Sequence, residues 1–203
     1  IYNTRLLAPE QLTGWQDLFR PELRGRIAFA DPGVSGSSFT GLVTMLHALG
    51  GDREDAVRRF AGALDGRQLE GSGDVLTAVS GGGCWAGITL EETALKRVDA
   101  GDSIALVYPK EGTSLVPDGS AIVKGAAHPD NAKRFVDFTL SPEVQKLLLE
   151  QYRRPVRTDI ALTGELPGEE DMQVLDYDVA WASSHHDTVL MSWAFYLDKE
   201  ETA

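Results

Sequence analysis

The segment Asp31–Ser38 contains the residues best suited to chemistry, because three serines and two glycines stand between an apolar run and a helical pattern. At a helix start the first backbone N–H groups lack partners inside the helix, and the helix dipole favours negative charge there. Ser35, Gly36 and Ser37, with Ser38 beside them, therefore predict a site for a phosphate, phosphonate or carboxylate group. The pattern is equally typical of a serine-capped helix after a glycine turn. It lacks the lysine and the spacing of a P-loop.

Two further loops have related chemistry. Ser72 and Gly73 precede a short helical pattern, and Thr89 follows the expected strand that ends near Ile88. Glu92 lies three residues after Thr89, so a capping box is the simpler explanation of that pair. Ligands of open α/β sheets bind at the carboxyl ends of strands. Three such junctions bearing Ser or Thr therefore predict one lined cleft.

Other reactive side chains do not form a recognisable centre in the sequence. His185, His186 and Asp187 are adjacent, and neighbouring helix residues do not share a face, so a metal site is not expected. Cys84 lies in an apolar run and is expected to be an inert thiol. No G-x-S-x-G elbow surrounds the serines, and no spacing assigns a histidine base to Ser35 or Ser37. We expect no cofactor and no metal.

Composition narrows the class of protein. The 203 residues include 19 Lys and Arg against 31 Asp and Glu, a formal net charge of −12 that argues against a nucleic-acid partner. No run approaches the roughly 18 apolar residues of a membrane span. A single cysteine excludes an internal disulfide. The chain begins at Ile1, without a methionine or a signal peptide, so we expect either a removed targeting segment or a piece of a longer protein.

Apolar spacing and turn residues predict alternating strands and helices, an α/β fold. Helices are expected from near Ser37 or Ser38 to Leu49, around residues 56–64, 75–79, 91–98 and 132–138, after the Ser141–Pro142 cap, and within residues 179–197. Strands are expected at residues 26–30, 84–88, 104–108 and 120–123. The polar segment 161–171 is expected to be a linker.

An ordered set of short motifs resembles the extracellular solute-binding proteins of ABC transporters, in the branch that includes ferric-iron, phosphonate and sugar-phosphate binders. The set is Tyr2-Asn3-Thr4, Trp15-Gln16-Asp17-Leu18, Gly25-Arg26-Ile27-Ala28, Asp31-Pro32, Ser35-Gly36-Ser37, Gly87-Ile88-Thr89-Leu90-Glu91-Glu92, Val107-Tyr108-Pro109-Lys110-Glu111-Gly112-Thr113, Asn131-Ala132-Lys133-Arg134-Phe135 and Asp176-Tyr177-Asp178. Each motif is weak alone, but their number and order make the match specific.

The resemblance implies a periplasmic-binding-protein type 2 fold, two α/β lobes with mixed sheets flanked by helices and a ligand trapped between them. It implies a hinge strand at residues 1–7, a second ligand-binding lobe at 8–105, a return hinge at 106–112, helices of the first lobe at 113–160, the linker at 161–171, and a C-terminal segment at 172–203 that packs on the second lobe. Most of the first lobe, on the order of 100 residues, is then absent, and that lobe or a partner chain would cover the exposed surface.

The resemblance also implies export to the periplasm or extracellular space and delivery of a small anionic solute to an ABC transporter permease. It carries the anion contacts onto Ser35, Gly36 and Ser37, and further contacts onto Ser38, Ser72, Gly73, Thr89 and Glu91. Iron-binding members have adjacent tyrosines near Thr89–Glu92, where this chain has none, so ferric iron is not the expected ligand. The alternatives are a ligand-sensing domain of a signalling receptor and a serine-dependent hydrolase.

Overall fold

The computed structural model describes residues 1–164 and 166–201, and it divides the chain into two compact units. The first unit contains Ile1–Leu115 and Glu169–Ala203, and the second contains Val116–Gly168. Expected hinge and lobe boundaries remain predictions. Among the described residues, no helix combines the length and the hydrophobicity needed to cross a membrane.

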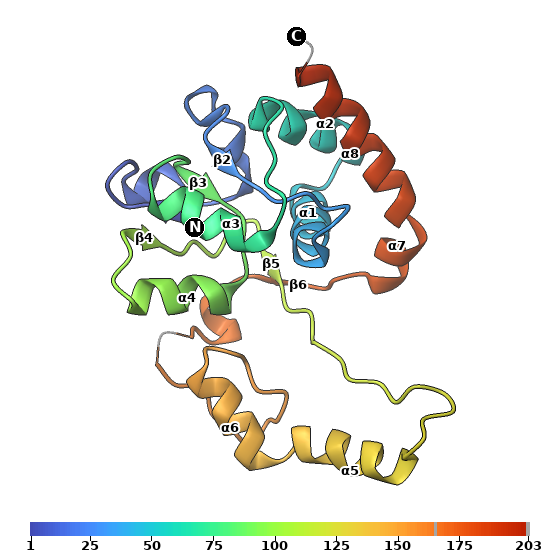
Figure 1. The fold of residues 1–203 in the computed structure, drawn as a ribbon. Helices are drawn as coiled ribbons and strands as arrows, with labels where there is room; N and C mark the ends of the chain where they lie inside the picture. The colour runs from blue at the N-terminus through green and yellow to red at the C-terminus, as the bar shows by residue number, and fades with distance from the viewer. Residues whose placement is uncertain (165, 202–203) are drawn as a thin grey trace. The chain divides into compact units, whose positions relative to one another are not determined.

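The first unit is built on a four-stranded sheet in the order β2-β3-β1-β4 (Figure 1). Its strands are β1 (Tyr2–Asn3), β2 (Ile27–Ala28), β3 (Ala86–Gly87) and β4 (Ile104–Ala105). β2 and β3 are parallel, whereas β1 is antiparallel to both β3 and β4. β4 therefore runs in the same direction as β2 and β3. A parallel bridge between Ala30 and Leu69 extends this set beyond β2.

Helices cover both faces of this sheet. They are α1 (Gly36–Leu49), α2 (Arg53–Leu64), α3 (Ser72–Ser80), α4 (Glu91–Asp99), α7 (Val179–Ser184) and α8 (His186–Glu201). Single turns of 3-10 helix span Pro9–Gln11, Trp15–Phe19, Pro21–Leu23 and Glu169–Asp171. A second small sheet pairs β5 (Thr113–Ser114) with β6 (Val174–Leu175) in parallel.

Side chains in and directly after β2 point alternately to the two faces of the sheet, and each face has its own hydrophobic core. Successive side chains of a strand point to opposite faces. Phe29 lies in the core shared with α1, α2 and α8, where its ring packs edge-on against Phe60 and Trp193. Ala28 and Ala30 face the other core, whose remaining members come from α3, α4 and Ile104 of β4.

The second unit contains α5 (Pro129–Thr139) and α6 (Pro142–Glu150). Ser141 caps α6 by accepting a hydrogen bond from the Val144 N–H, as the sequence predicts. The strand expected at residues 120–123 is wrong. This segment is exposed and pairs with no strand among the described residues, since apolar β-branched residues alone supply no partner for the backbone.

Candidate functional site

The three predicted loops come to the same edge of the sheet. Each loop follows the carboxyl end of one of the parallel segments. The loop before α1 follows Ala30, the loop before α3 follows Leu69, and the loop before α4 follows Gly87. Parallel strands bring these ends together. Within the described residues no hydrogen bond joins one of these three loops to another at its serine or threonine side chains. The three loops thus lie at one sheet edge, but their serine and threonine side chains do not bond from one loop to another.

The loop before α1 brings the three serine hydroxyls into contact. Ser35 is the N-cap, and its Oγ accepts hydrogen bonds from the Ser38 N–H at 3.3 Å and the Ser38 hydroxyl at 3.1 Å. The Ser37 Oγ lies 3.1 Å from the same oxygen. Ser35 and Ser38 therefore form the serine cap that the sequence pattern allowed, and the cap uses the Ser38 amide. Ser38 itself is buried. The helix starts slightly earlier than predicted.

Two backbone amides remain available in this turn. The structure gives the N–H groups of Gly36 and Ser37 no hydrogen-bond acceptor among the described residues, whereas those of Ser35 and Phe39 donate to Asp31 and Ser35 carbonyls. Gly36 is exposed, and a methyl group placed on its Cα would meet no atom within 4 Å. The first turn of α1 also carries no acidic residue. This turn can therefore accept a negative group from solvent.

The start of α3 is less suited to an anion. Gly71 is the N-cap, and the Ser72 side chain makes no capping bond. Gly73 is exposed with open space beside it, but Asp74 stands in the same turn. The Asp74 carboxylate already supplies the negative charge that the dipole favours, and it would repel a second one.

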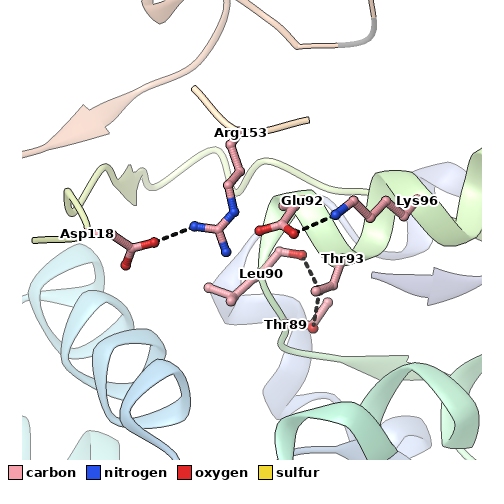
Figure 2. Close-up of polar contacts among 7 residues, drawn as sticks. All are labelled: Thr89, Leu90, Glu92, Thr93, Lys96, Asp118 and Arg153. Carbon is pink, nitrogen blue, oxygen red and sulfur yellow. Dashed lines mark hydrogen bonds and ion pairs between the residues drawn. The ribbon is translucent and has the colours of Figure 1, made fainter. Parts of the chain in front are cut away.

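The start of α4 has a different chemistry. Leu90, not Thr89, is the N-cap, and no side chain caps this helix, so the expected capping box is wrong. Instead, the Thr89 hydroxyl lies 3.3 Å from the Thr93 hydroxyl, and the Lys96 ammonium donates to the Glu92 carboxylate at 2.8 Å. Figure 2 shows both contacts. In a capping box the Glu92 carboxylate would accept a hydrogen bond from the Thr89 backbone N–H. Here the same carboxylate instead pairs with Lys96, four residues further along the helix.

Glu91 has a partner that the sequence reasoning missed. The Tyr108 hydroxyl donates to the Glu91 Oε1 at 2.6 Å, and both side chains are half-buried. Tyr108 follows β4, which runs parallel to β3, so its position at the same sheet edge brings the two together. The strand predicted at residues 104–108 could have indicated this contact, because Tyr108 stands at its carboxyl end and the predicted loops also follow carboxyl ends of strands.

An open groove of about 450 Å³ lies on another side of α1. Its lining does not include Ser35, Gly36 or Ser37, and consists of Phe39, Tyr177, Val179, Ala182, Ser183, Ser184, His186 and Asp187. Burial raises the pKa of the Tyr177 phenol, while the nearby Thr40 acts in the opposite direction. The groove is aromatic and lacks the bare amides of the α1 turn.

Other chemistry finds little support in the described residues. No group of three His, Cys, Asp or Glu side chains there could hold a metal ion. Hydrogen bonds of the Ser35, Ser37 and Ser38 hydroxyls go to one another, and no imidazole takes part. Burial raises the pKa of the half-buried Cys84 thiol, which disfavours the reactive thiolate.

The sequence profile described as bacterial extracellular solute-binding protein matches residues 1–181. This chain belongs to that family. Two relatives are an uncharacterised protein of Haemophilus influenzae, 34% identical over 139 residues, and a protein of Salmonella typhi provisionally named as a 2-aminoethylphosphonate-binding periplasmic protein, 24% identical over 197 residues. These alignments cover 68% and 89% of this chain, which spans only 40% and 58% of the relatives.

Solved structures confirm the periplasmic-binding-protein fold. The periplasmic binding protein AfuA from Actinobacillus pleuropneumoniae, solved with exogenous fructose-6-phosphate bound, is 25% identical with a TM-score of 0.85. The match covers 97% of this chain and 65% of AfuA. A two-component system protein that mediates signal transduction is also 25% identical, with a TM-score of 0.79 and coverage of 93% and 65%. The resemblance and the α/β fold are both confirmed.

Proposed function

We propose that this chain is part of the substrate-binding component of an ABC importer. The protein captures a small organic anion, a phosphorylated, phosphonate or carboxylate compound, between two lobes in the periplasm or extracellular space and presents it to the permease. Membership of the solute-binding family supports this role, as do the 2-aminoethylphosphonate for which the Salmonella relative is named and the fructose-6-phosphate bound to AfuA. The chain itself acts as a receptor and not as an enzyme.

The first turn of α1 carries the proposal. Of the helix starts at this sheet edge it alone combines two unpartnered amides, from Gly36 and Ser37, with no acidic residue in the turn. A phosphate or phosphonate oxygen would accept from these amides and from the Ser35 and Ser37 hydroxyls. The net charge of −12 does not prevent this, because charges beyond about 8 Å are screened at physiological salt.

Glu91 and Tyr108 would contact the other end of the ligand. The Glu91 carboxylate holds the Tyr108 hydroxyl at 2.6 Å and can accept from a ligand ammonium or hydroxyl group. Ser72, Gly73 and Thr89 would line the same cleft. A larger share of the selectivity would come from a first lobe, because the chain spans only part of its relatives. Exposed Phe135 and Phe138 on α5 offer that lobe an apolar contact.

Removal of one hydroxyl tests the proposed site. We expect Ser37→Ala to weaken binding of the best anion by about 1.5–3 kcal/mol, the range for hydrogen bonds to charged groups. The full protein would be titrated calorimetrically with 2-aminoethylphosphonate, fructose-6-phosphate, inorganic phosphate and succinate. Ser183→Ala, at an exposed serine of α7, is the matched control and should bind normally. Unchanged affinity in Ser37→Ala would remove α1 from the site.

A sensory role is the second candidate. The structural similarity to a two-component system protein supports a ligand-sensing domain with the same fold. Both roles use the same cleft, so ligand binding does not separate them. Import would be tested by measuring uptake of the radiolabelled ligand in cells that lack the gene. Loss of uptake would indicate a transport receptor. A change in transcription with uptake unchanged would indicate a sensor. Hydrolysis has no observation in its favour, since the serine hydroxyls lack a base.

A further inference from the structure

Two motifs of the sequence, one around Trp15 and one at residues 108–113, meet in the first unit. The Glu111 carboxylate accepts hydrogen bonds from the Trp15 N–H at 2.9 Å and from the Gln16 N–H at 3.2 Å. The indole N–H of the buried Trp15 donates to the Gly112 carbonyl at 2.8 Å. A carboxylate from a distant part of the chain thus satisfies two amides at the start of a 3-10 turn.

Further contacts join the same two segments. The Lys110 N–H donates to the Thr13 carbonyl at 3.0 Å, and the Lys110 ammonium donates to the Thr13 hydroxyl at 3.0 Å. A methyl group placed on the Gly14 Cα would overlap the Glu111 carboxylate, so glycine makes room for that side chain. We call residues 13–16 together with residues 110–112 the clasp.

The chain that leaves the clasp is also held at β5. The Thr113 N–H donates to the Gln173 carbonyl at 2.9 Å, next to the pairing of β5 with β6. On α1, the hydroxyl of the buried Thr44 donates to the Thr40 carbonyl at 2.8 Å. The Ser114 hydroxyl, 2.6 Å from the Thr44 hydroxyl, is therefore the donor of that hydrogen bond. The first unit thus holds the outgoing chain as far as Ser114.

The next ten residues have few contacts. Every residue from 116 to 125 is exposed, and the segment contains no helix or strand (Figure 1). Among the described residues, the amides of residues 118–124 find no backbone acceptor. The exposed Asp118 carboxylate pairs with Arg153 inside the second unit, and exposed ion pairs contribute little to stability. The backbone of this segment can therefore change its angles at low cost.

We propose that the clasp and the Ser114 contact fix residues 110–114 to the first unit, so that movement between the two units bends the outgoing chain within residues 116–125. Hinges are short segments whose few residues absorb the change in backbone angles. The return hinge that the family resemblance implies at residues 106–112 stays a prediction, and the clasp favours the later segment. This inference does not depend on the ligand or on the import role.

Hydrogen exchange resolved to single amides, and corrected for intrinsic rates, tests the position of the hinge. In the purified protein we expect the amides of Lys110 and Thr113 to exchange at least about 100-fold more slowly than those of residues 118–124, because only the former are held by acceptors in the first unit. Exchange at Lys110 as fast as in residues 118–124 would place flexibility inside the clasp and overturn the proposal. Protection of residues 118–124 equal to that of α1 would also overturn it.

Glu111→Ala tests the clasp itself. The amides of Lys110 and Thr113 keep their own acceptors in this variant, the carbonyls of Thr13 and Gln173. We nevertheless expect both amides to exchange about tenfold faster or more, the effect of losing one hydrogen bond to a charged group. Glu150→Ala, at an exposed glutamate of the second unit, is the matched control and should leave both rates unchanged.

Unchanged rates in Glu111→Ala would show that the carboxylate does not hold the outgoing chain. Thermal melting identifies a variant that fails to fold, and Glu111→Gln then decides, because its amide oxygen still accepts one hydrogen bond without the charge. We expect Glu111→Gln to accelerate the Lys110 amide less than Glu111→Ala does.

Ser114→Ala tests the contact with α1. It removes the hydroxyl that donates to Thr44 and leaves the clasp intact. We expect faster exchange at the Thr113 amide and an unchanged rate at the Lys110 amide. Ser120→Ala makes the same change at an exposed serine of the proposed hinge and should alter neither rate. Equal rates at Thr113 in Ser114→Ala and in the wild type would remove α1 from the anchor.

Discussion

In the proposed site, Gly36 would serve binding without being required by the fold. A methyl group on its Cα would find open space, so packing does not require glycine there. The Gly36 and Ser37 amides beside this open space have no hydrogen-bond acceptor among the described residues. The adjoining Ser35 Oγ, already an acceptor for two groups of Ser38, can use its own proton toward Ser37 or toward a ligand.

Gly36→Ala should therefore separate affinity from stability. We expect the melting temperature to stay the same or rise slightly, because Ala is favoured over Gly in helices by roughly 0.5–1 kcal/mol. We expect anion affinity to fall, because the new methyl stands beside the two amides. Scanning and titration calorimetry on the same samples would measure both. Gly119→Ala, also in open space, is the control, and an unaltered affinity for Gly36→Ala would count against the α1 site.

His47 provides a prediction about pH. Burial, followed by the positive charge of Arg53, lowers the pKa of His47 below its ordinary 6.5, while Asp178 acts in the opposite direction. The imidazole packs edge-on against Trp181, over whose ring the Arg53 guanidinium lies at 4.3 Å. The unfolded chain thus binds the proton more tightly, so the stability from neutral His47 is present above pH 6.5 and is lost below it.

His47→Gln should flatten this part of the stability profile. Urea unfolding at pH 7.5 and at pH 5 would be compared for the two proteins. We expect the wild type to lose more stability on acidification than His47→Gln does. His128→Gln, at an exposed histidine of the other unit, is the matched control. Equal losses in wild type and His47→Gln would exclude the titration of His47 as a cause.

At the scale of elements, the site depends on how tightly β3 fits between its neighbours. A methyl group on Gly87 would lie 2.9 Å from Val75 Cγ1, 3.0 Å from Val79 Cγ2 and 3.1 Å from the Ala28 carbonyl oxygen. Glycine thus permits α3 to pack close against β3, next to the loop that carries Thr89 and Glu91. The close packing of α3 on β3 depends on this glycine.

Gly87→Ala should destabilise the protein by about 1–3 kcal/mol, the usual cost of adding a methyl to a packed core. Urea unfolding followed by tryptophan fluorescence would measure this loss. Gly36→Ala adds the same group in open space and is the internal comparison. A stability for Gly87→Ala equal to wild type would mean that β3 and α3 move apart without cost.

At the scale of the whole molecule, the two units differ in how many side chains they bury in a hydrophobic core. The first contains both hydrophobic clusters around the sheet, with seven buried residues in α1 alone. In the second, α5 has no buried residue, and α6 buries only Gln145. The Gln145 amide donates to the Thr139 carbonyl, and its oxygen accepts from the Val156 N–H.

Amide hydrogen exchange should reveal this difference. We expect the amides of α5 to exchange at least about 100-fold faster than those of α1, because helices with few buried apolar contacts open at low free energy. Mass spectrometry of peptides from both helices, taken from one sample, gives the comparison directly. Similar protection in α5 and α1 would indicate that α5 is covered, as a further lobe would cover it.

Much of the fold was predictable from local patterns. The apolar spacing that ends at Leu49 and the Ser141–Pro142 start predict helices, and both form. The predictions that failed needed information from elsewhere in the chain. Residues 120–123 look like a strand but find no partner, and Thr89 looks like a cap although the Glu92 carboxylate turns to Lys96.

The sequence by itself determined the α/β class, the family resemblance and the serine-rich start of α1, because these depend on residue types and short spacings. Only the tertiary structure decided which helix start keeps two amides without an acceptor among the described residues, and that Tyr108 meets Glu91. The physical reason is that a hydrogen bond between distant segments depends on strand order and direction, which short-range periodicity does not specify.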